Sequence, residues 1–281
     1  MGPQRGERWS SLSVEFMLTR SVRDSAALLD VLAGPAPGDP YHAAPPAKSY
    51  ASALQEKLKP LRIGLLAHAP SGIEVGPDPV RVVRDTAKAL EQLGHHVEEA
   101  YPAALDEAET PLVWVQLVAT NVARGLDAHG ARLGRVLTQD DVEPLTFAMA
   151  EAGRAVSAPQ LLLALEQMHS LSRRLTNFFD NFDLLLTPTQ ALPPPRLGYL
   201  TSTREEPWRA LFRCSPYGTF TLPWNMSGQP AISLPMGMTS DGLPIGAQLV
   251  AGFGREDLLL QVAAQLELAR PWGARTPPVF G

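Results

Sequence analysis

Residues 220–267 read FTLPWNMSGQPAISLPMGMTSDGLPIGAQLVAGFGREDLLLQVAAQLE, and this stretch decides the fold. Two aliphatic segments in it, Ala231 to Leu234 and Ile245 to Val250, predict β-strands. The turn-forming sequence Ser240-Asp241-Gly242 lies between them. Arg255 to Glu267 predicts a helix whose acidic first turn stabilises its N-terminus. The stretch therefore predicts two strands joined by a turn and followed by a helix.

Three further strands are predicted upstream. Leu61 to Leu66 and Asp183 to Thr187 are short and mostly aliphatic, as in strands that are buried on both faces. A helix from Asp78 to Gly94 connects the first of them to a strand over His96 to Ala100. Strand, helix and strand over about 40 residues indicate a βαβ unit with a right-handed crossover. We therefore predict an α/β protein with a mixed β-sheet flanked by helices.

The other periodic segments predict helices. They are Ser21 to Leu32, where Ser21 can cap the first turn, then Tyr50 to Leu58, Thr110 to Asp127, Pro144 to Ala155 and Pro159 to Phe179. The last of these has an apolar stripe made of Leu161, Leu162, Leu165, Met168, Leu171 and Leu175. Two segments rich in proline, 34–46 and 190–206, predict loops.

The composition argues against several classes of protein. The chain has 281 residues, 45% of them hydrophobic, which suffices for one large core or two modest ones. A net charge of -5 argues against binding nucleic acid or anionic membranes, which need basic surfaces. No apolar run approaches the roughly 18 residues of a membrane helix, and the opening MGPQRGERWSS lacks the apolar region of a signal peptide. The single cysteine, Cys214, suits a reducing compartment, so a cytoplasmic location is expected.

Several motifs occur in an informative order. The pattern Asn-x-small-Gly-x-Pro-Ala occupies 225–231, and Phe182-Asp183 with Thr187-Pro188 precedes it. Near the start, Leu18 to Asp24 is followed by Gly34-Pro35 and Asp39-Pro40. In these motifs the chain resembles the amidase signature family, whose members hydrolyse amide bonds and some ester bonds. The stretch from Trp9 to Tyr41 is most similar to the aminohexanoate cyclic-dimer hydrolases, which act on nylon by-products, and to their broad-specificity relatives.

The resemblance implies catalysis by a serine nucleophile, a second serine in a cis peptide, and a lysine that acts as the base, with no cofactor. The sequence holds no Gly-Gly-Ser run, no Gly-x-Ser-x-Gly motif and no Ser-x-x-Lys motif. Its four lysines lie where solvated charges are expected: Lys48, Lys57, Lys59 and Lys88. The resemblance therefore implies that the Ser-Ser-Lys core lies upstream of Met1 and that no residue of this chain is catalytic.

The same comparison of motifs predicts the organisation of the chain. Residues 1–281 are expected to be the C-terminal portion of a single amidase-type domain, incomplete at its N-terminal side. Its predicted parts are a helical lead-in (1–60), the βαβ unit (61–101), a helical region of the substrate cleft (102–180) and a C-terminal sheet and helix (181–281).

Five residues are candidates for contact with substrate: Trp114, Cys214, Phe220, Trp224 and Gln229. Substrate clefts are mostly apolar with a few polar groups, and these residue types fit that description. Core packing explains the three aromatic residues and Gln229 equally well. For Cys214, a role as a small hydrophobic residue is favoured over a reactive thiol. No metal site is predicted, because His95 and His96 are adjacent in a strand and point to opposite sides.

The expected function is that of an amidase-family hydrolase polypeptide, truncated and weak or inactive alone, with a small amide or ester as its substrate. One alternative is an active esterase or amidase with a site rebuilt around Cys214 or Ser215. The other is a non-catalytic binding or interaction module. Because a truncated sheet exposes strand edges and apolar surface, homo-oligomers that cover this face are also expected.

Overall fold

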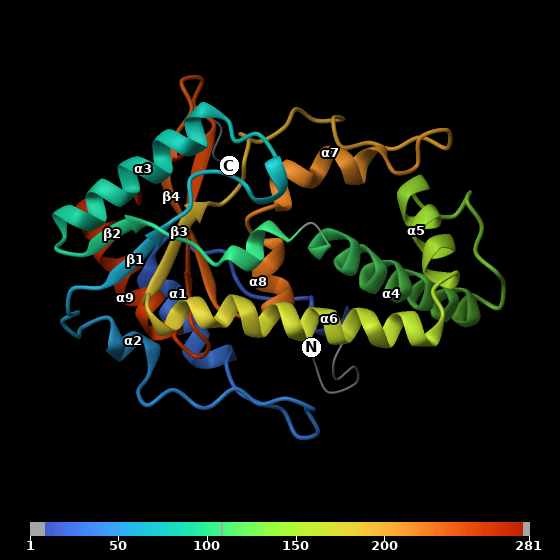
Figure 1. Ribbon diagram of the computed structural model, residues 1–281, viewed down its shortest axis with the longest axis horizontal. Helices are drawn as coiled ribbons and strands as arrows, with labels where there is room; N and C mark the ends of the chain where they lie inside the picture. Colours follow the sequence, from blue (N-terminus) through green and yellow to red (C-terminus); the bar gives the residue numbers. More distant parts are fainter. Residues whose placement is uncertain (1–8, 108, 278–281) are drawn as a thin grey trace.

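The structure is a computed structural model that describes residues 9–107 and 109–277. Within these residues one five-stranded sheet crosses the molecule in the strand order β2-β1-β3-β5-β4 (Figure 1). The strands are β1 (Arg62–Leu65), β2 (His96–Glu99), β3 (Leu184–Pro188), β4 (Ala231–Met238) and β5 (Pro244–Ala251). The α-helices are α1 (Val22–Leu32), α2 (Tyr50–Ala53), α3 (Pro77–Gln92), α4 (Thr110–Leu133), α5 (Pro144–Arg154), α6 (Ala158–Thr176), α7 (Arg209–Gly218), α8 (Leu222–Ser227) and α9 (Glu256–Ala269).

The sheet is mixed, as the sequence predicts. Strand β1 pairs in parallel with both β2 and β3, and α3 connects β1 to β2. Strand β5 pairs antiparallel with β3 on one side and with β4 on the other. The predicted α/β class with a mixed sheet is therefore confirmed, and the predicted βαβ unit has parallel strands.

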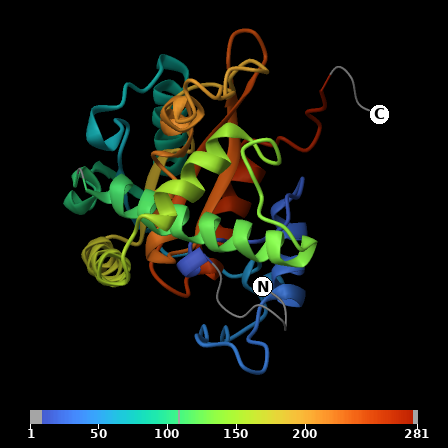
Figure 2. The same cartoon turned by 90° about the vertical axis from the view of Figure 1, so that its right-hand side faces the viewer.

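Helices cover both faces of the sheet, and alternate residues of each strand point to opposite faces. Leu184 and Leu186 of β3 pack with α1, α3 and α9 in a first core. Leu185 points the other way and packs with α4, α6 and α8 in a second core. Beyond the second core, α4 and α5 lie against each other (Figure 2). The molecule therefore consists of two helical layers with the sheet between them.

Local sequence explains where two of these helices begin. The Ser21 side chain accepts a hydrogen bond from the backbone N–H of Asp24, which caps α1 as predicted. At the start of α6, Ser157 and Gln160 form a capping box, in which each side chain accepts from the other's backbone N–H. Both caps satisfy N–H groups that have no partner inside the helix.

The sequence patterns do not predict α7 and α8, and the predicted apolar stripe of α6 is partly wrong. The segments that form α7 and α8 contain Pro216 and Pro223, and proline usually indicates a break rather than a helix. Pro223 lies in the first turn of α8, where a missing N–H costs nothing. In α6, Leu162 is 61% exposed, and Ala164 occupies the buried position beside it. The predicted stripe contains only large apolar residues, so it omits Ala164, which faces the core.

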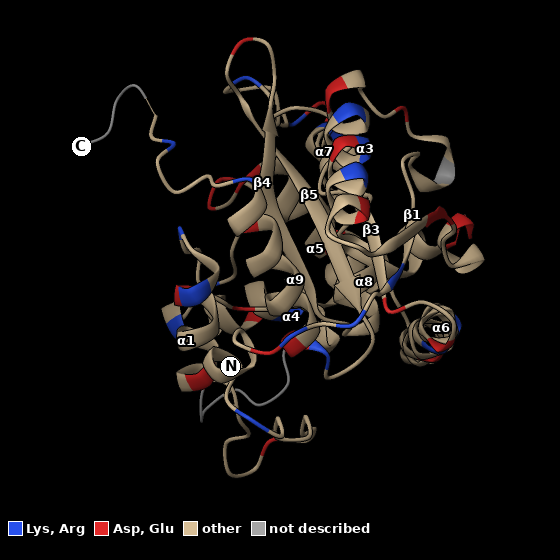
Figure 3. Ribbon diagram, turned by 90° about the vertical axis from the view of Figure 1, so that its left-hand side faces the viewer, with Lys and Arg blue, Asp and Glu red and all other residues tan. Residues whose placement is uncertain are grey.

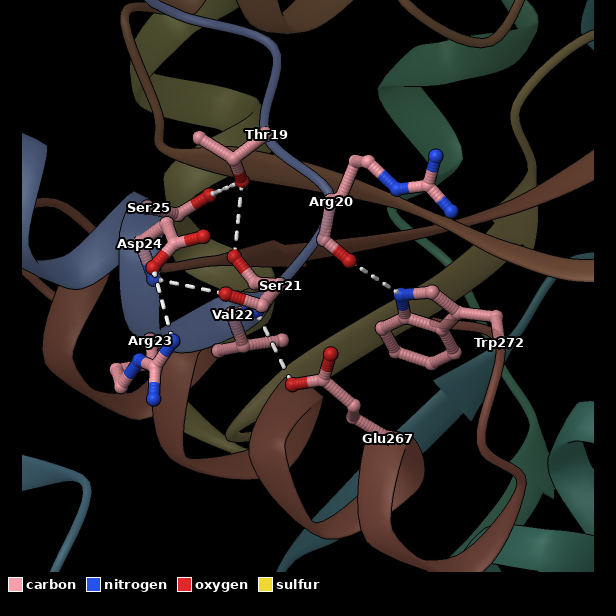
Figure 4. A network of polar contacts seen from close by, with 9 residues as sticks. All are labelled: Thr19, Arg20, Ser21, Val22, Arg23, Asp24, Ser25, Glu267 and Trp272. Carbon is pink, nitrogen blue, oxygen red and sulfur yellow. Dashed lines mark hydrogen bonds and ion pairs between the residues drawn. The ribbon is translucent and has the colours of Figure 1, made fainter. Parts of the chain in front are cut away.

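The segment Thr19–Ser25 connects the beginning of the described chain to its end (Figure 4). Glu267 of α9 accepts a hydrogen bond from the backbone N–H of Val22 at 3.1 Å. The indole Nε1 of Trp272 donates to the backbone oxygen of Arg20, also at 3.1 Å. Parts of the sequence that lie about 250 residues apart therefore hold each other in place.

Charged side chains lie on helices, on loops and on the strands β1 and β2, whereas β3, β4 and β5 carry none (Figure 3). Strand β4 forms one edge of the sheet. It contains Pro235, and its pairing with β5 shifts register between Leu234 and Gly237. Proline and bulges are typical of edge strands, because the outward backbone groups have no strand to pair with. Among the described helices, none combines the length and apolar character that crossing a lipid bilayer requires.

Candidate functional site

Polar residues replace aliphatic ones on the second-core face of the sheet at the carboxyl end of β3. Thr187 lies directly opposite Gln248 of β5, and Gln248 lies directly opposite Ser233 of β4. Directly opposed residues of antiparallel strands point to the same face, so these three side chains form a row across the sheet. The carboxyl ends of strands are where α/β proteins most often bind ligands.

Gln248 organises the buried end of this row. Its side chain is 3% exposed, and its Nε2 donates to Thr187 Oγ1 at 3.0 Å and to the backbone oxygen of Phe220 at 2.8 Å. Thr187 Oγ1 in turn donates to the backbone oxygen of Pro188 at 2.7 Å. The amide therefore fixes the segment that leads into α8 against the end of β3.

The open end of this row consists of two neighbouring hydroxyl groups and a hollow in front of them. Thr189 Oγ1 and Ser233 Oγ lie 2.7 Å apart. A side chain at Gly246 would place its Cβ 2.6 Å from Thr189 Oγ1 and 2.8 Å from Ser233 Oγ, so only glycine leaves room for the pair. The hollow in front of it measures about 190 Å³ and is lined by Thr189, Gln190, Leu192, Ser233, Pro244, Ile245 and Gly246.

The structure places four of the five sequence candidates inside or against the core. Phe220 and Trp224 belong to the second core and are 3% and 4% exposed, and the half-buried Trp114 packs against this core. Gln229 is 5% exposed, and its Nε2 donates to the backbone oxygen of Ala251 at 3.5 Å. Core packing therefore accounts for Phe220 and Trp224, and neither lines the hollow.

Cys214 and Ser215 lie on α7, close in sequence to its contact with the hollow's loop. The backbone N–H of Ala191 donates to the backbone oxygen of Pro216 at 2.8 Å, which joins α7 to that loop. The thiol of Cys214 and the hydroxyl of Ser215 both donate to the backbone oxygen of Leu211, at 3.1 and 3.4 Å. Burial raises the pKa of the Cys214 thiol above its ordinary value, so the neutral thiol predominates at pH 7. This geometry does not activate either group as a nucleophile.

Alkylation with iodoacetamide tests the state of Cys214. Because the thiolate is the reactive form, we expect the folded protein at pH 7.5 to react about tenfold more slowly than the same chain in urea. The rate should still rise with pH above 9, since a raised pKa moves the formation of thiolate upward. A rate that levels off below pH 8 would contradict this assignment.

His95, Lys48 and Lys88 each have a structural partner. His95 is buried, and its Nδ1 accepts a hydrogen bond from the backbone N–H of Leu61, while its Nε2 lies 2.9 Å from Gln265 Oε1. Lys48 pairs with Glu56 and Lys88 with Asp85, and both ion pairs are exposed. These residues support the fold, and none of them lines the hollow.

Sequence reasoning missed Thr189, Ser233 and Gly246. The signal for Thr189 is its position directly after the buried strand β3, because ligands of α/β proteins bind at the carboxyl ends of strands. This signal becomes usable only when the order of the strands in the sheet is known. Ser233 lies in β4 and Gly246 in β5, and their approach follows from the register in which these two strands pair. No local pattern gives that register.

Comparison with known proteins is consistent with this fold. The family profile described as Amidase matches residues 4–260. The 6-aminohexanoate-cyclic-dimer hydrolases of Pseudomonas sp. (strain NK87) and Paenarthrobacter ureafaciens are each 40% identical to this chain over 273 residues, which cover 95% of this chain and 55% of theirs. A solved structure of 6-aminohexanoate cyclic dimer hydrolase superimposes with a TM-score of 0.88 at 40% identity, covering 92% of this chain and 55% of the other.

The chain therefore spans about half the length of the curated relatives that it matches. The expected absence of the Ser-Ser-Lys core is not borne out by these comparisons and stays a prediction. The resemblance that the motifs indicate is confirmed by the profile match, the sequence identity and the superposition together. The chain belongs to the amidase signature family.

Proposed function

We propose that the protein serves in the hydrolysis of carboxamide C–N bonds by supplying the substrate-binding face at the end of β3. The observation that carries this proposal is the hollow beside Thr189 and Ser233, in a chain that is 40% identical to proteins named as cyclic-dimer hydrolases. In the reaction, water adds across the C–N bond, so that the acyl carbon gains a hydroxyl and the nitrogen leaves as an amine. The substrate class that we propose is a small linear or cyclic amide.

The isolated chain is proposed to turn over slowly. Among the described residues, Thr189 and Ser233 hydrogen-bond to each other, and Cys214 and Ser215 to a backbone oxygen. None of these groups is paired with a base that could take its proton, which acyl transfer by a hydroxyl requires. We propose that the nucleophile and base implied by the family resemblance act on an amide that this chain helps to hold. The single cysteine favours a reducing compartment, and we propose that the reaction is cytoplasmic.

A chimera tests the proposal. The part of the Pseudomonas hydrolase that precedes its aligned region would be joined to this chain, and release of amine from 6-aminohexanoate cyclic dimer would be measured. We expect the chimera to exceed the isolated chain by at least about 10³-fold, because the absence of a nucleophile and its base lowers the kcat of a hydrolase by several orders of magnitude.

The controls separate the rival functions. Cys214→Ala and Ser215→Ala in the isolated chain should leave its low rate unchanged. An isolated chain with robust turnover that either substitution abolishes would instead support a rebuilt site on α7. A chimera that folds and binds the dimer without hydrolysing it would overturn the proposed function and favour a non-catalytic binding module.

A further inference from the structure

The paired hydroxyls of Thr189 and Ser233 have hydrogen-bonding capacity to spare. Each hydroxyl can donate once and accept twice, and their mutual bond at 2.7 Å uses one donor and one acceptor site. The hydroxyl that accepts keeps its own O–H free, and the hydroxyl that donates keeps its lone pairs. The pair can therefore give one hydrogen bond and receive another at neighbouring positions.

The space in front of the pair fits a small ligand group. The hollow of about 190 Å³ is smaller than the roughly 300–1,000 Å³ of a complete small-molecule pocket, so it has room for part of a substrate. Leu192, Pro244 and Ile245 supply apolar walls beside the hydroxyls. The bare Cα of Gly246 keeps the approach to the pair open.

None of the residues that line the hollow carries a charge. A carboxylate or an ammonium group that enters it would lose water without gaining an opposite charge, which is unfavourable. An uncharged amide loses less, because its carbonyl accepts a hydrogen bond and its N–H donates one. The hydroxyl pair can donate a hydrogen bond to the carbonyl oxygen and accept one from the N–H.

We propose that Thr189 and Ser233 form a subsite that recognises an uncharged cis secondary amide, as in a small lactam, through both its C=O and its N–H. These two groups lie on the same side of a cis amide, so both can reach a pair of hydroxyl oxygens 2.7 Å apart. One hydroxyl donates to the carbonyl oxygen of the substrate, and the other accepts from its N–H. The subsite thereby favours secondary amides over esters and tertiary amides, which lack the N–H, and over charged groups. This inference rests on the proposed function and specifies the substrate class of the same site.

Ligand-detected NMR titration of the purified protein tests the subsite without requiring turnover. The probes are ε-caprolactam, which is a neutral secondary amide, then N-methylcaprolactam and ε-caprolactone, which lack the N–H, and 6-aminohexanoate, which is charged. We expect caprolactam to bind about fivefold more tightly than either ring without the N–H, which corresponds to one net hydrogen bond. The 6-aminohexanoate ion should bind more weakly still.

Variants assign the binding to the two hydroxyls. Thr189→Val combined with Ser233→Ala should weaken caprolactam binding about tenfold and abolish the difference between caprolactam and its N-methyl analogue. Thr189→Ser keeps a hydroxyl and should bind as the original protein does. Thr201→Val, a matched change in an exposed loop, should leave the affinity unchanged. Thermal melts of each variant show whether it is folded.

Three results would overturn the subsite. The first is equal affinity for caprolactam and its N-methyl analogue, and the second is a folded double variant that binds caprolactam as well as the original. The third is the absence of any caprolactam binding. Because no step of this experiment depends on hydrolysis, an inactive chimera with intact selectivity would refute the proposed function and leave the subsite in place.

Discussion

Gln248→Glu should lower the free energy of unfolding by about 3 kcal/mol at pH 7, because it leaves a buried charge without a partner. The Gln248 amide is almost fully buried, and both of its hydrogen bonds use Nε2 as the donor. A carboxylate in its place cannot donate, and it would face the backbone oxygen of Phe220. Unfolding in urea, followed by tryptophan fluorescence, measures the loss.

The loss in the free energy of unfolding should increase as the pH rises. Burial raises the pKa of the introduced carboxyl in the folded protein above its unfolded value of about 4.3. The penalty is therefore absent below the unfolded pKa, grows as pH rises between the two values, and is complete above the folded one. Gln55→Glu makes the same chemical change at an exposed position and should show little of this effect. A Gln248→Glu protein as stable as the original at pH 7 would show that water reaches the carboxylate.

Gly153→Ala should be the most damaging single methyl addition in the helical layer. Gly153 of α5 packs so closely on α4 that an added Cβ would lie 2.1 Å from the backbone oxygen of Ala119. Because the obstacle is backbone, the two helices must separate. We expect a loss of about 3 kcal/mol, the upper end for overpacking. Calorimetry should then show a Tm lower by roughly 6–12 °C for a chain of this size.

Gly125→Ala is the matched control on α4. An alanine Cβ at that position meets no heavy atom within 4 Å, and alanine favours the helix over glycine by about 0.5–1 kcal/mol. The two glycine-to-alanine changes should therefore shift Tm in opposite directions. A rise in Tm for both would show that intrinsic helix propensity, rather than the α4–α5 contact, determines the result.

The strands and most helices could be predicted from sequence because each carries its own local signal. Buried β3 is a continuous aliphatic run, and Ser21 and Ser157 indicate the first turns of α1 and α6. Helices α7 and α8 were missed because Pro216 and Pro223 give local signals that tertiary packing overrides. The exposure of Leu162 shows that apolar spacing alone does not say where the buried face is centred.

The candidate site was less accessible to prediction. Aromatic residues near the family motif indicate a pocket. Phe220 and Trp224 lie in the second core, and their contact with substrate stays a prediction. The hydroxyl pair lies between residues 44 positions apart, and its spacing depends on how β4 and β5 pair. Register of this kind is a property of the whole sheet, so no window of sequence around Thr189 or Ser233 contains it.

Two hydrogen bonds, from the Val22 N–H to Glu267 of α9 and from the Trp272 indole to the Arg20 carbonyl, set an order for folding. Their partners lie 245 and 252 residues away, whereas the β1–α3–β2 unit closes within a short stretch of chain. Contacts between distant segments form late, because closing the long loop between them costs conformational entropy. During synthesis on the ribosome, α1 therefore emerges before α9, yet it must wait until α9 has been made before the two helices can pack together.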